Sequence, residues 1–164
     1  MVPEIFFSAC YDSVDVSSEI SKLYTFQPAV LHGYCRRKRR YADSPGITED
    51  LGHQVAGVFV TGLTDDIMIK LDYFEGREYH RRQVRVKLAA KVGNAAGSGN
   101  LGGETRAAEV YVFNDKRDLE QEEWDFKQFL NDRLLIWTKP GYVQGRCDPD
   151  TPAEVIEGIS SVHS

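Results

Sequence analysis

The chain has 164 residues, of which 41% are hydrophobic and 27% charged, and its formal net charge is -5 at pH 7. This length suits one domain built around a single core. No apolar run approaches the roughly 20 residues that a transmembrane helix needs, so the sequence predicts no membrane span. The negative charge disfavours a general nucleic-acid binder.

The cysteines and histidines show no metal-binding or disulfide pattern. Cys10, Cys35 and Cys147 are odd in number and form no C-x-x-C pair, which favours reduced thiols and a cytoplasmic location. The four histidines are scattered without metal-ligand spacing, so we expect no metal and no cofactor. Glu4 stands where a secretory signal would carry basic residues, so we expect no signal.

The first predicted element is a helix. Its apolar residues recur at the spacing of one helix face: Val2, Ile5, Phe6, Ala9 and Cys10. Pro3 suits a first helical turn, and Glu4 complements the positive end of the helix dipole. A second amphipathic stretch, 17–24, is predicted to continue or follow this helix.

Strand patterns dominate after Pro28. Strands are predicted at 29–42 and 53–63, separated by the turn-rich DSPGITEDLG, and again at 79–90 and 105–114. Residues 93–103 are expected to form a flexible glycine-rich hairpin insertion.

Two further helices are predicted. The first covers 64–76, with Thr64 or Asp65 as N-cap, Gly76 just past the end, and Met68, Leu71 and Tyr73 or Phe74 facing the core. The second runs from roughly 120 to 135, with Trp124, Phe129 and Leu130 among its buried candidates. The pattern predicts an α+β domain over 1–137, whose mainly antiparallel sheet curls into a small barrel, followed by a loosely held tail at 138–164.

The segment LDYFEGREYHRR concentrates chemically capable side chains. Glu75 lies at a predicted helix end beside Gly76, where its carboxylate could point into a cleft. Partial burial would raise the pKa of such a carboxylate and suit it to general-base catalysis. In the alternative interpretation, Glu75 pairs at the surface with Arg77 or Arg81.

Two other motifs are less specific. The basic run RRKRR at 36–40 could bind nucleic acid, but we interpret it as the solvated edge of a strand. Pro45 and Gly46 could form an ordinary turn, or the glycine could bring backbone close to a ligand. The sequence contains no G-x-S-x-G elbow and no Gly-rich phosphate loop.

Taken in order, five segments resemble the gamma-glutamylcyclotransferase-like family, in particular its plant and fungal avirulence-induced-gene-like branch: PAVLHGYCRRKRRYADSPGI, HQVAGVFVTGLT, LDYFEGREYHRRQVRV, AEVYVF and EEWDFKQFL. The resemblance covers most of residues 1–135. Its most specific feature is the ordered series of an L-x-G-Y strand, a P-G-I turn, a V-x-G strand and L-D-x-x-E-G-x-x-Y-x-R.

The resemblance implies a small β-barrel with flanking helices whose cavity binds a γ-glutamyl group. It implies that Glu75 is the general base in a reaction that closes the substrate to 5-oxoproline and releases an amine. Tyr79 and Arg81 match the same motif and are expected to shape the cavity or hold Glu75, with Pro45 and Gly46 also binding substrate. The implied partner is a small γ-glutamyl molecule, not a nucleic acid or a membrane.

The N-terminus departs from the family pattern, in which a strand ending in Y-G-T/S-L forms a substrate-binding loop. MVPEIFF resembles the family segment on the C-terminal side of that loop, so we expect the first strand and its loop to be absent from this chain. Placing Phe7–Cys10 or Tyr11–Val14 on the loop motif loses the glycine and contradicts the helical spacing. The chain would then be a catalyst lacking part of its cradle, or a catalytically silent member that binds a metabolite or protein.

Overall fold

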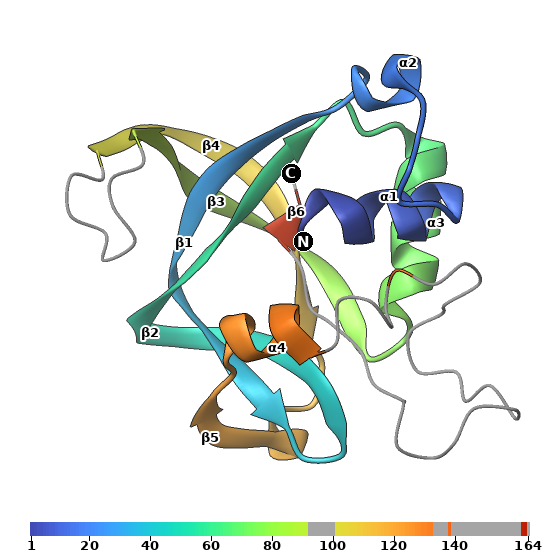
Figure 1. The fold of residues 1–164 in the computed structure, drawn as a ribbon. Coiled ribbons are helices and arrows are strands. Elements are labelled where there is room, and N and C mark those ends of the chain that lie inside the picture. The colour runs from blue at the N-terminus through green and yellow to red at the C-terminus, as the bar shows by residue number, and fades with distance from the viewer. Residues whose placement is uncertain (92–100, 133–137, 139–161, 164) are drawn as a thin grey trace, which may run out of the picture.

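The computed structural model describes residues 1–91, 101–132, 138 and 162–163 (Figure 1). Six strands and four α-helices are assigned within these residues, with one short 3-10 helix, η1. The elements are α1 (Pro3–Tyr11), α2 (Ser18–Ser21), β1 (Thr25–Arg39), β2 (Ala42–Thr61), α3 (Asp65–Glu75), β3 (Tyr79–Lys91), β4 (Leu101–Phe113), η1 (Lys116–Asp118), β5 (Leu119–Glu123), α4 (Phe126–Asp132) and β6 (Val162–His163).

The strands form one antiparallel sheet in the order β2-β1-β3-β4-β6, and β5 pairs with the far end of β1. The sheet curls, because β2 and β4 also contact each other. Helices α1 and α3 lie side by side next to the curled sheet (Figure 1). The predicted α+β class, with a mainly antiparallel sheet and flanking helices, is confirmed.

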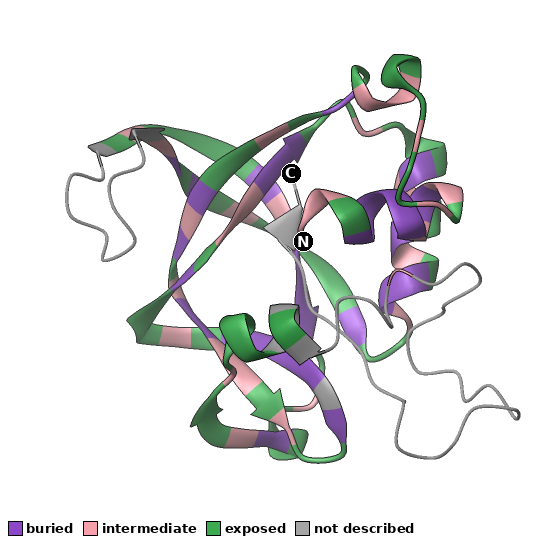
Figure 2. Ribbon diagram, in the orientation of Figure 1, coloured by how far each residue is buried: buried purple, intermediate pink, exposed green. Residues whose placement is uncertain are grey.

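Two hydrophobic clusters stabilise this arrangement. One fills the inside of the curled sheet with alternating side chains of β1 to β4, including Leu31, Phe59 and Val86. The other joins α1 and α3 to the sheet, with Phe6 and Leu71 fully buried at its centre. Buried positions accordingly alternate along the strands and face inward on the two helices (Figure 2).

The predicted helices at the start and middle of the chain are confirmed. In α1, Ile5, Phe6 and Cys10 are buried as their spacing predicts. The Thr64 side chain caps α3 by accepting a hydrogen bond from the Ile67 backbone, and Gly76 follows the last helical residue. On α3, Leu71 and Phe74 face the core, whereas Tyr73 is exposed. The second stretch, 17–24, forms only the single-turn helix α2.

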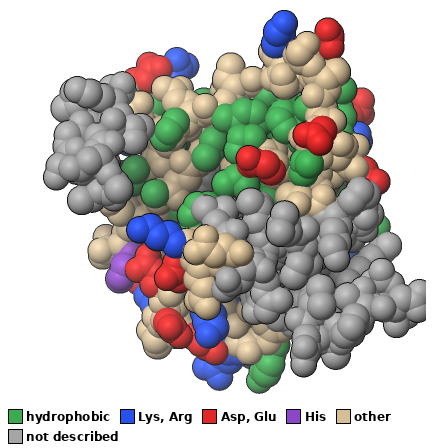
Figure 3. Space-filling view, in the orientation of Figure 1, with side chains coloured by type: hydrophobic (Ala, Val, Ile, Leu, Met, Phe, Trp, Pro, Cys, Tyr) green, Lys and Arg blue, Asp and Glu red, His purple; other side chains and the backbone are tan. Residues whose placement is uncertain are grey.

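Three predictions around β1 are wrong. The turn-rich segment 43–52 belongs to the continuous strand β2, and the helix expected from 120 begins at Phe126, since 119–123 form β5. The basic run is not an edge, because Arg37 and Arg39 pair with β2 on one side and with β5 on the other. Charged side chains of both signs gather over this part of the molecule (Figure 3).

The structure describes only part of the predicted insertion and of the C-terminal tail. Of the predicted insertion 93–103, residues 101–103 belong to β4, and 93–100 lie outside the described residues. In the tail, Val162 and His163 pair with β4, while most other positions beyond Asp132 lie outside the described residues. No helix among the described residues is long and apolar enough to cross a membrane.

Candidate active site

Glu75 is the last residue of α3, and its side chain points into the protein. Only 2% of its surface is exposed. The Glu75 side chain points inward because it lies on the same face of α3 as Leu71 and Phe74, which pack into the core. Gly76 then takes φ 80° and ψ -175°, a backbone conformation essentially restricted to glycine, and ends the helix. The local sequence therefore places one carboxylate in the interior.

Two tyrosines lie within electrostatic range of Glu75. Burial raises the pKa of both Tyr79 and Tyr111, and the negative charge of Glu75 raises them further. The Tyr79 hydroxyl donates to the carbonyl oxygen of Pro45 at 3.0 Å, and the Tyr111 hydroxyl donates to Asp72 Oδ1 at 2.6 Å. Both phenols are therefore neutral and fixed in orientation beside the carboxylate.

Arg81 contacts Asp72, which in turn contacts Tyr111. Its Nε is 3.0 Å from Asp72 Oδ1, and its Nη1 donates to Glu109 Oε2 at 2.8 Å. These ion pairs are partly exposed. Because Asp72 also accepts from Tyr111, Arg81 is linked to the surroundings of Glu75 through these two side chains.

Pro45 and Gly46 lie in β2, so they do not form the expected turn. The carbonyl of Pro45 is the acceptor for the Tyr79 hydroxyl. A Cβ on Gly46 would come within 2.6 Å of Leu119 Cδ2 and 2.9 Å of Phe113 Cβ. The close approach that glycine permits here is therefore to the protein's own β4 and β5.

Arg39 also belongs to this region, although the sequence pattern predicts a solvated residue. Its guanidinium lies over the ring of Phe113, 4.7 Å from the centroid, and donates to Ser44 Oγ and Glu78 Oε2, each at 2.7 Å. Its positive charge acts on Tyr79, because it lowers the pKa that burial raises. Only the cross-strand register reveals these contacts, so no local motif could have identified Arg39.

A hollow of about 450 Å³ opens beside the N-terminal segment. Arg36 lines it, with its guanidinium 5.7 Å from the ring centroid of Trp124 and 5.6 Å from that of Phe126. Arg36 Nη2 donates to the Ala56 carbonyl, whereas its buried Nε has no hydrogen-bond partner among the described residues. Burial lowers the pKa of Arg36 to about 10, and Glu123 opposes that shift. The hollow thus offers a cation and aromatic walls.

Met1 connects this hollow with Glu75. It lines the hollow and lies within electrostatic range of both Arg36 and Glu75. Glu75 itself is not among the described residues that line the hollow. The predicted base and the cationic hollow are therefore neighbouring features, with Met1 at their junction.

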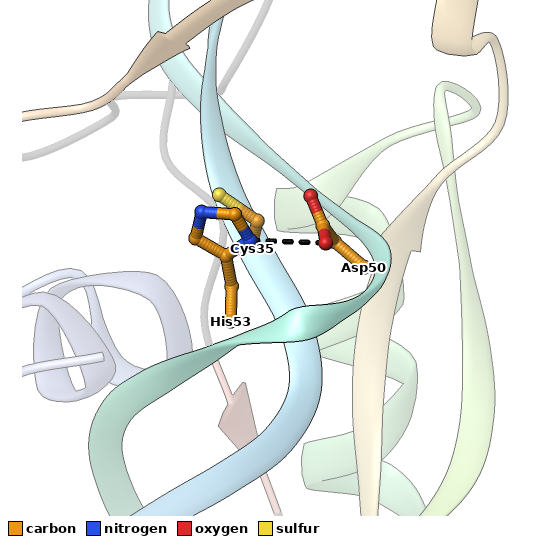
Figure 4. A group of neighbouring side chains, drawn as sticks. All are labelled: Cys35, Asp50 and His53. Carbon is orange, nitrogen blue, oxygen red and sulfur yellow. Dashed lines mark ion pairs between the residues drawn. The ribbon is translucent and has the colours of Figure 1, made fainter.

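A separate group of side chains could hold a metal ion: Cys35, Asp50 and His53 (Figure 4). All three residues belong to the β1–β2 hairpin.

Comparison with known proteins identifies relatives in Arabidopsis thaliana. The chain is 33% identical to Protein AIG2 C over 103 residues, which cover 62% of this chain and 56% of that protein. It is 29% identical to Protein AIG2 B over 126 residues, covering 75% and 68%. For three of the four curated relatives, the match spans about half of the relative's length.

Two solution structures from Arabidopsis thaliana also match. That of At3g28950.1 is 32% identical, with a TM-score of 0.44 and coverage of 65% of this chain and 59% of the other. That of At5g39720.1 is 24% identical, with a TM-score of 0.45 and coverage of 65% of each chain.

A family model described as gamma-glutamyl cyclotransferase, AIG2-like, also matches this chain. It matches residues 13–126, a range that includes β1 to β5 and the helix carrying Glu75. This range is well over half of the 164 residues. The chain therefore belongs to the gamma-glutamyl cyclotransferase, AIG2-like family.

Proposed function

We propose that this protein cyclises a γ-glutamyl amine or peptide to 5-oxoproline, with Glu75 as the general base. The observation that carries the proposal is the burial of this one carboxylate at a helix end, beside two oriented tyrosines. Membership of the family supports the same reaction class. The odd number of cysteines suits action in the cytoplasm.

In the proposed reaction, the substrate's α-amino nitrogen attacks its own γ-carbonyl carbon. Glu75 accepts a proton from that nitrogen as the new C–N bond closes the five-membered ring. The bond from the same γ-carbonyl carbon to the original amide nitrogen then breaks, and the proton passes from Glu75 to the departing amine. Atoms and charge balance without a cofactor, so the protein must supply a base, a bent substrate and donors for the oxyanion.

The neighbouring residues have positioning and binding roles in this proposal. The hydrogen bond from Tyr79 to the Pro45 carbonyl ties β3 to β2 near Glu75, while Gly46 lets β4 and β5 pack closely against β2. Arg81 orients Asp72 and, through it, Tyr111. We propose that substrate enters through the hollow, past Met1.

Arg36 is the proposed anchor for the substrate's carboxylate. Its buried Nε can donate a hydrogen bond that no described residue accepts, and a charge-assisted bond of this kind is among the stronger ones. Arg36→Gln should therefore raise KM more than it lowers kcat.

The test is incubation of purified protein with a panel of γ-glutamyl amines and γ-glutamyl peptides, following release of 5-oxoproline by mass spectrometry. Glu78→Gln is a matched control, because this carboxylate is three positions away in a half-exposed ion pair with Arg39. Product from wild type and Glu78→Gln, but not from Glu75→Gln, supports the proposal. Equal product from Glu75→Gln refutes the role of Glu75.

A second candidate function is binding without turnover of a small metabolite or a protein partner. It is favoured by the finding that Glu75 does not line the hollow among the described residues. A γ-glutamyl compound that raises the melting temperature but yields no 5-oxoproline would support this function, and turnover would exclude it.

A further inference from the structure

We propose that Cys35, Asp50 and His53 form a binding site for a divalent cation of the zinc class. One ligand atom from each residue, Cys35 Sγ, a carboxylate oxygen of Asp50 and a ring nitrogen of His53, lies within 4.8 Å of the other two. Figure 4 shows the three side chains gathered between neighbouring segments of β1 and β2. The site does not include Glu75, and this proposal does not rest on the proposed cyclisation.

An irregularity in the β1–β2 pairing assembles the three residues. His32 pairs with Gln54 and Tyr34 pairs with Glu49, so the register shifts between these pairs and residues 50–53 stand opposite Gly33. Gly33 accommodates the shift with φ 78°, which a side chain would disfavour. The bulge turns Asp50 and His53 towards Cys35, which is why residues distant in sequence meet here.

A small inward movement of the three ligand atoms would bring them to the spacing found around a tetrahedral ion. Bonds of about 2.0–2.3 Å from zinc to nitrogen, oxygen and sulfur place ligand atoms roughly 3.5 Å apart. His53 Nδ1 is already 2.9 Å from Asp50 Oδ1, and the 4.8 Å limit covers the whole set. Rotation of the His53 side chain, which is 46% exposed, can open space for the ion between these groups.

The donor set selects the class of metal. Thiolate, imidazole and carboxylate together favour zinc and chemically similar ions, whereas magnesium and calcium prefer oxygen ligands alone. Three protein ligands leave a fourth position for water or another small ligand. Because a cysteine binds metal as the thiolate, the ion displaces one proton from the Cys35 sulfur when it binds.

Contacts with neighbouring groups hold the Asp50 carboxylate in place. Arg37 Nη2 binds Oδ2 at 2.6 Å and the Gly52 backbone N–H binds Oδ1 at 3.3 Å. Arg37 also donates to the carbonyl of Gln121 in β5, and this hydrogen bond fixes the Arg37 side chain beside Asp50. Such outer contacts orient ligands and strengthen metal binding.

Cobalt titration tests the site directly, because a cobalt–thiolate bond gives a near-ultraviolet charge-transfer band and tetrahedral cobalt gives intense visible bands. The experiment uses the untagged full chain with Cys147→Ser, so that the thiol outside the described residues cannot contribute. We expect one cobalt per chain, displaced by zinc. His53→Gln and Asp50→Asn should each weaken binding at least about tenfold.

Two controls separate this site from chance binding. His32→Gln removes an exposed imidazole on β1, the strand that carries Cys35. Cys10→Ser removes the other described thiol. Both variants should keep the cobalt bands. His53→Gln changes a half-exposed side chain, so its fold can be verified by circular dichroism even if Cys35→Ser is unstable. Absence of a thiolate band, or a band unchanged in folded His53→Gln and Asp50→Asn, would overturn the proposal.

Discussion

The hydroxyl of Tyr79 joins the region after α3 to β2. It donates to the Pro45 carbonyl in a buried hydrogen bond of 3.0 Å. Tyr79→Phe removes the donor and leaves that carbonyl without it, so we expect a loss of about 1–3 kcal/mol in the free energy of unfolding, measured by urea denaturation. Tyr41→Phe, at a side chain 78% exposed, should change it by less than about 0.5 kcal/mol. Equal effects would contradict the assigned contact.

Glu75 and Tyr79 could be proposed as site residues from sequence because both belong to one short motif. Residues that complete their surroundings could not: Arg39 and Tyr111 contribute through contacts between segments far apart in the chain. The same holds for Cys35, whose approach to Asp50 and His53 depends on a register shift. Sequence spacing along one segment carries no information about such cross-strand meetings.

At the level of elements, the end of α3 sets the direction of Glu75. Gly76 adopts φ 80° and ψ -175°, and no described atom lies within 4 Å of the position that an added Cβ would take. Gly76→Ala should therefore cost about 1–3 kcal/mol through backbone strain alone. It should also lower 5-oxoproline release by turning Glu75 from its place.

Gly52→Ala is the control for this substitution. Gly52 is exposed, and the nearest atom to an added Cβ is 3.7 Å away, an ordinary contact. Thermal denaturation of both variants gives the comparison. Gly76→Ala with the stability and activity of Gly52→Ala would show that the helix end does not position the carboxylate.

Elements with a strong period were predicted correctly, whereas two extended segments that pair with β1, 43–52 and 119–123, were not. Helices α1 and α3 show their buried faces in the sequence, as do the alternating β3 and β4. In contrast, LEQEE at 119–123 has helix-forming composition but is a strand because β1 supplies its hydrogen-bonding partner. The turn-like segment in β2 is likewise extended, and Pro45 is tolerated because β2 is an edge strand.

At the scale of the whole molecule, several buried acidic protons make stability sensitive to alkaline pH. Burial raises the pKa of the Cys10 thiol from 9.0 to about 12, and raises those of Tyr24, Tyr79 and Tyr111 above 10.0. When the chain unfolds, these groups ionise near their ordinary values. The stability from their neutral forms is thus fully present below about pH 9 and is lost as pH rises towards the folded values.

The melting temperature should accordingly fall steadily from about pH 9 to pH 11. Cys10→Ala removes one of these groups and should make the fall shallower, whereas Tyr41→Phe, at an exposed position, should leave its slope unchanged. A melting temperature independent of pH across this range, or a slope unaltered in Cys10→Ala, would argue against the linkage.

The curled sheet and the helical layer meet where the proposed base lies. One cluster fills the sheet interior, and the other unites α1 and α3 with Tyr79 and Tyr111. Since Glu75 ends α3 within this second layer, its position depends on how the helices dock on the sheet. We propose that the carboxylate at this position serves catalysis and not packing alone.

The most direct test is the rate of 5-oxoproline release by Glu75→Gln, a nearly isosteric change, relative to wild type under equal folding by circular dichroism. Loss of a general base predicts a fall of roughly 10²–10⁴-fold, with Glu78→Gln near the wild-type rate. A wild-type rate in folded Glu75→Gln would show that Glu75 is not the general base.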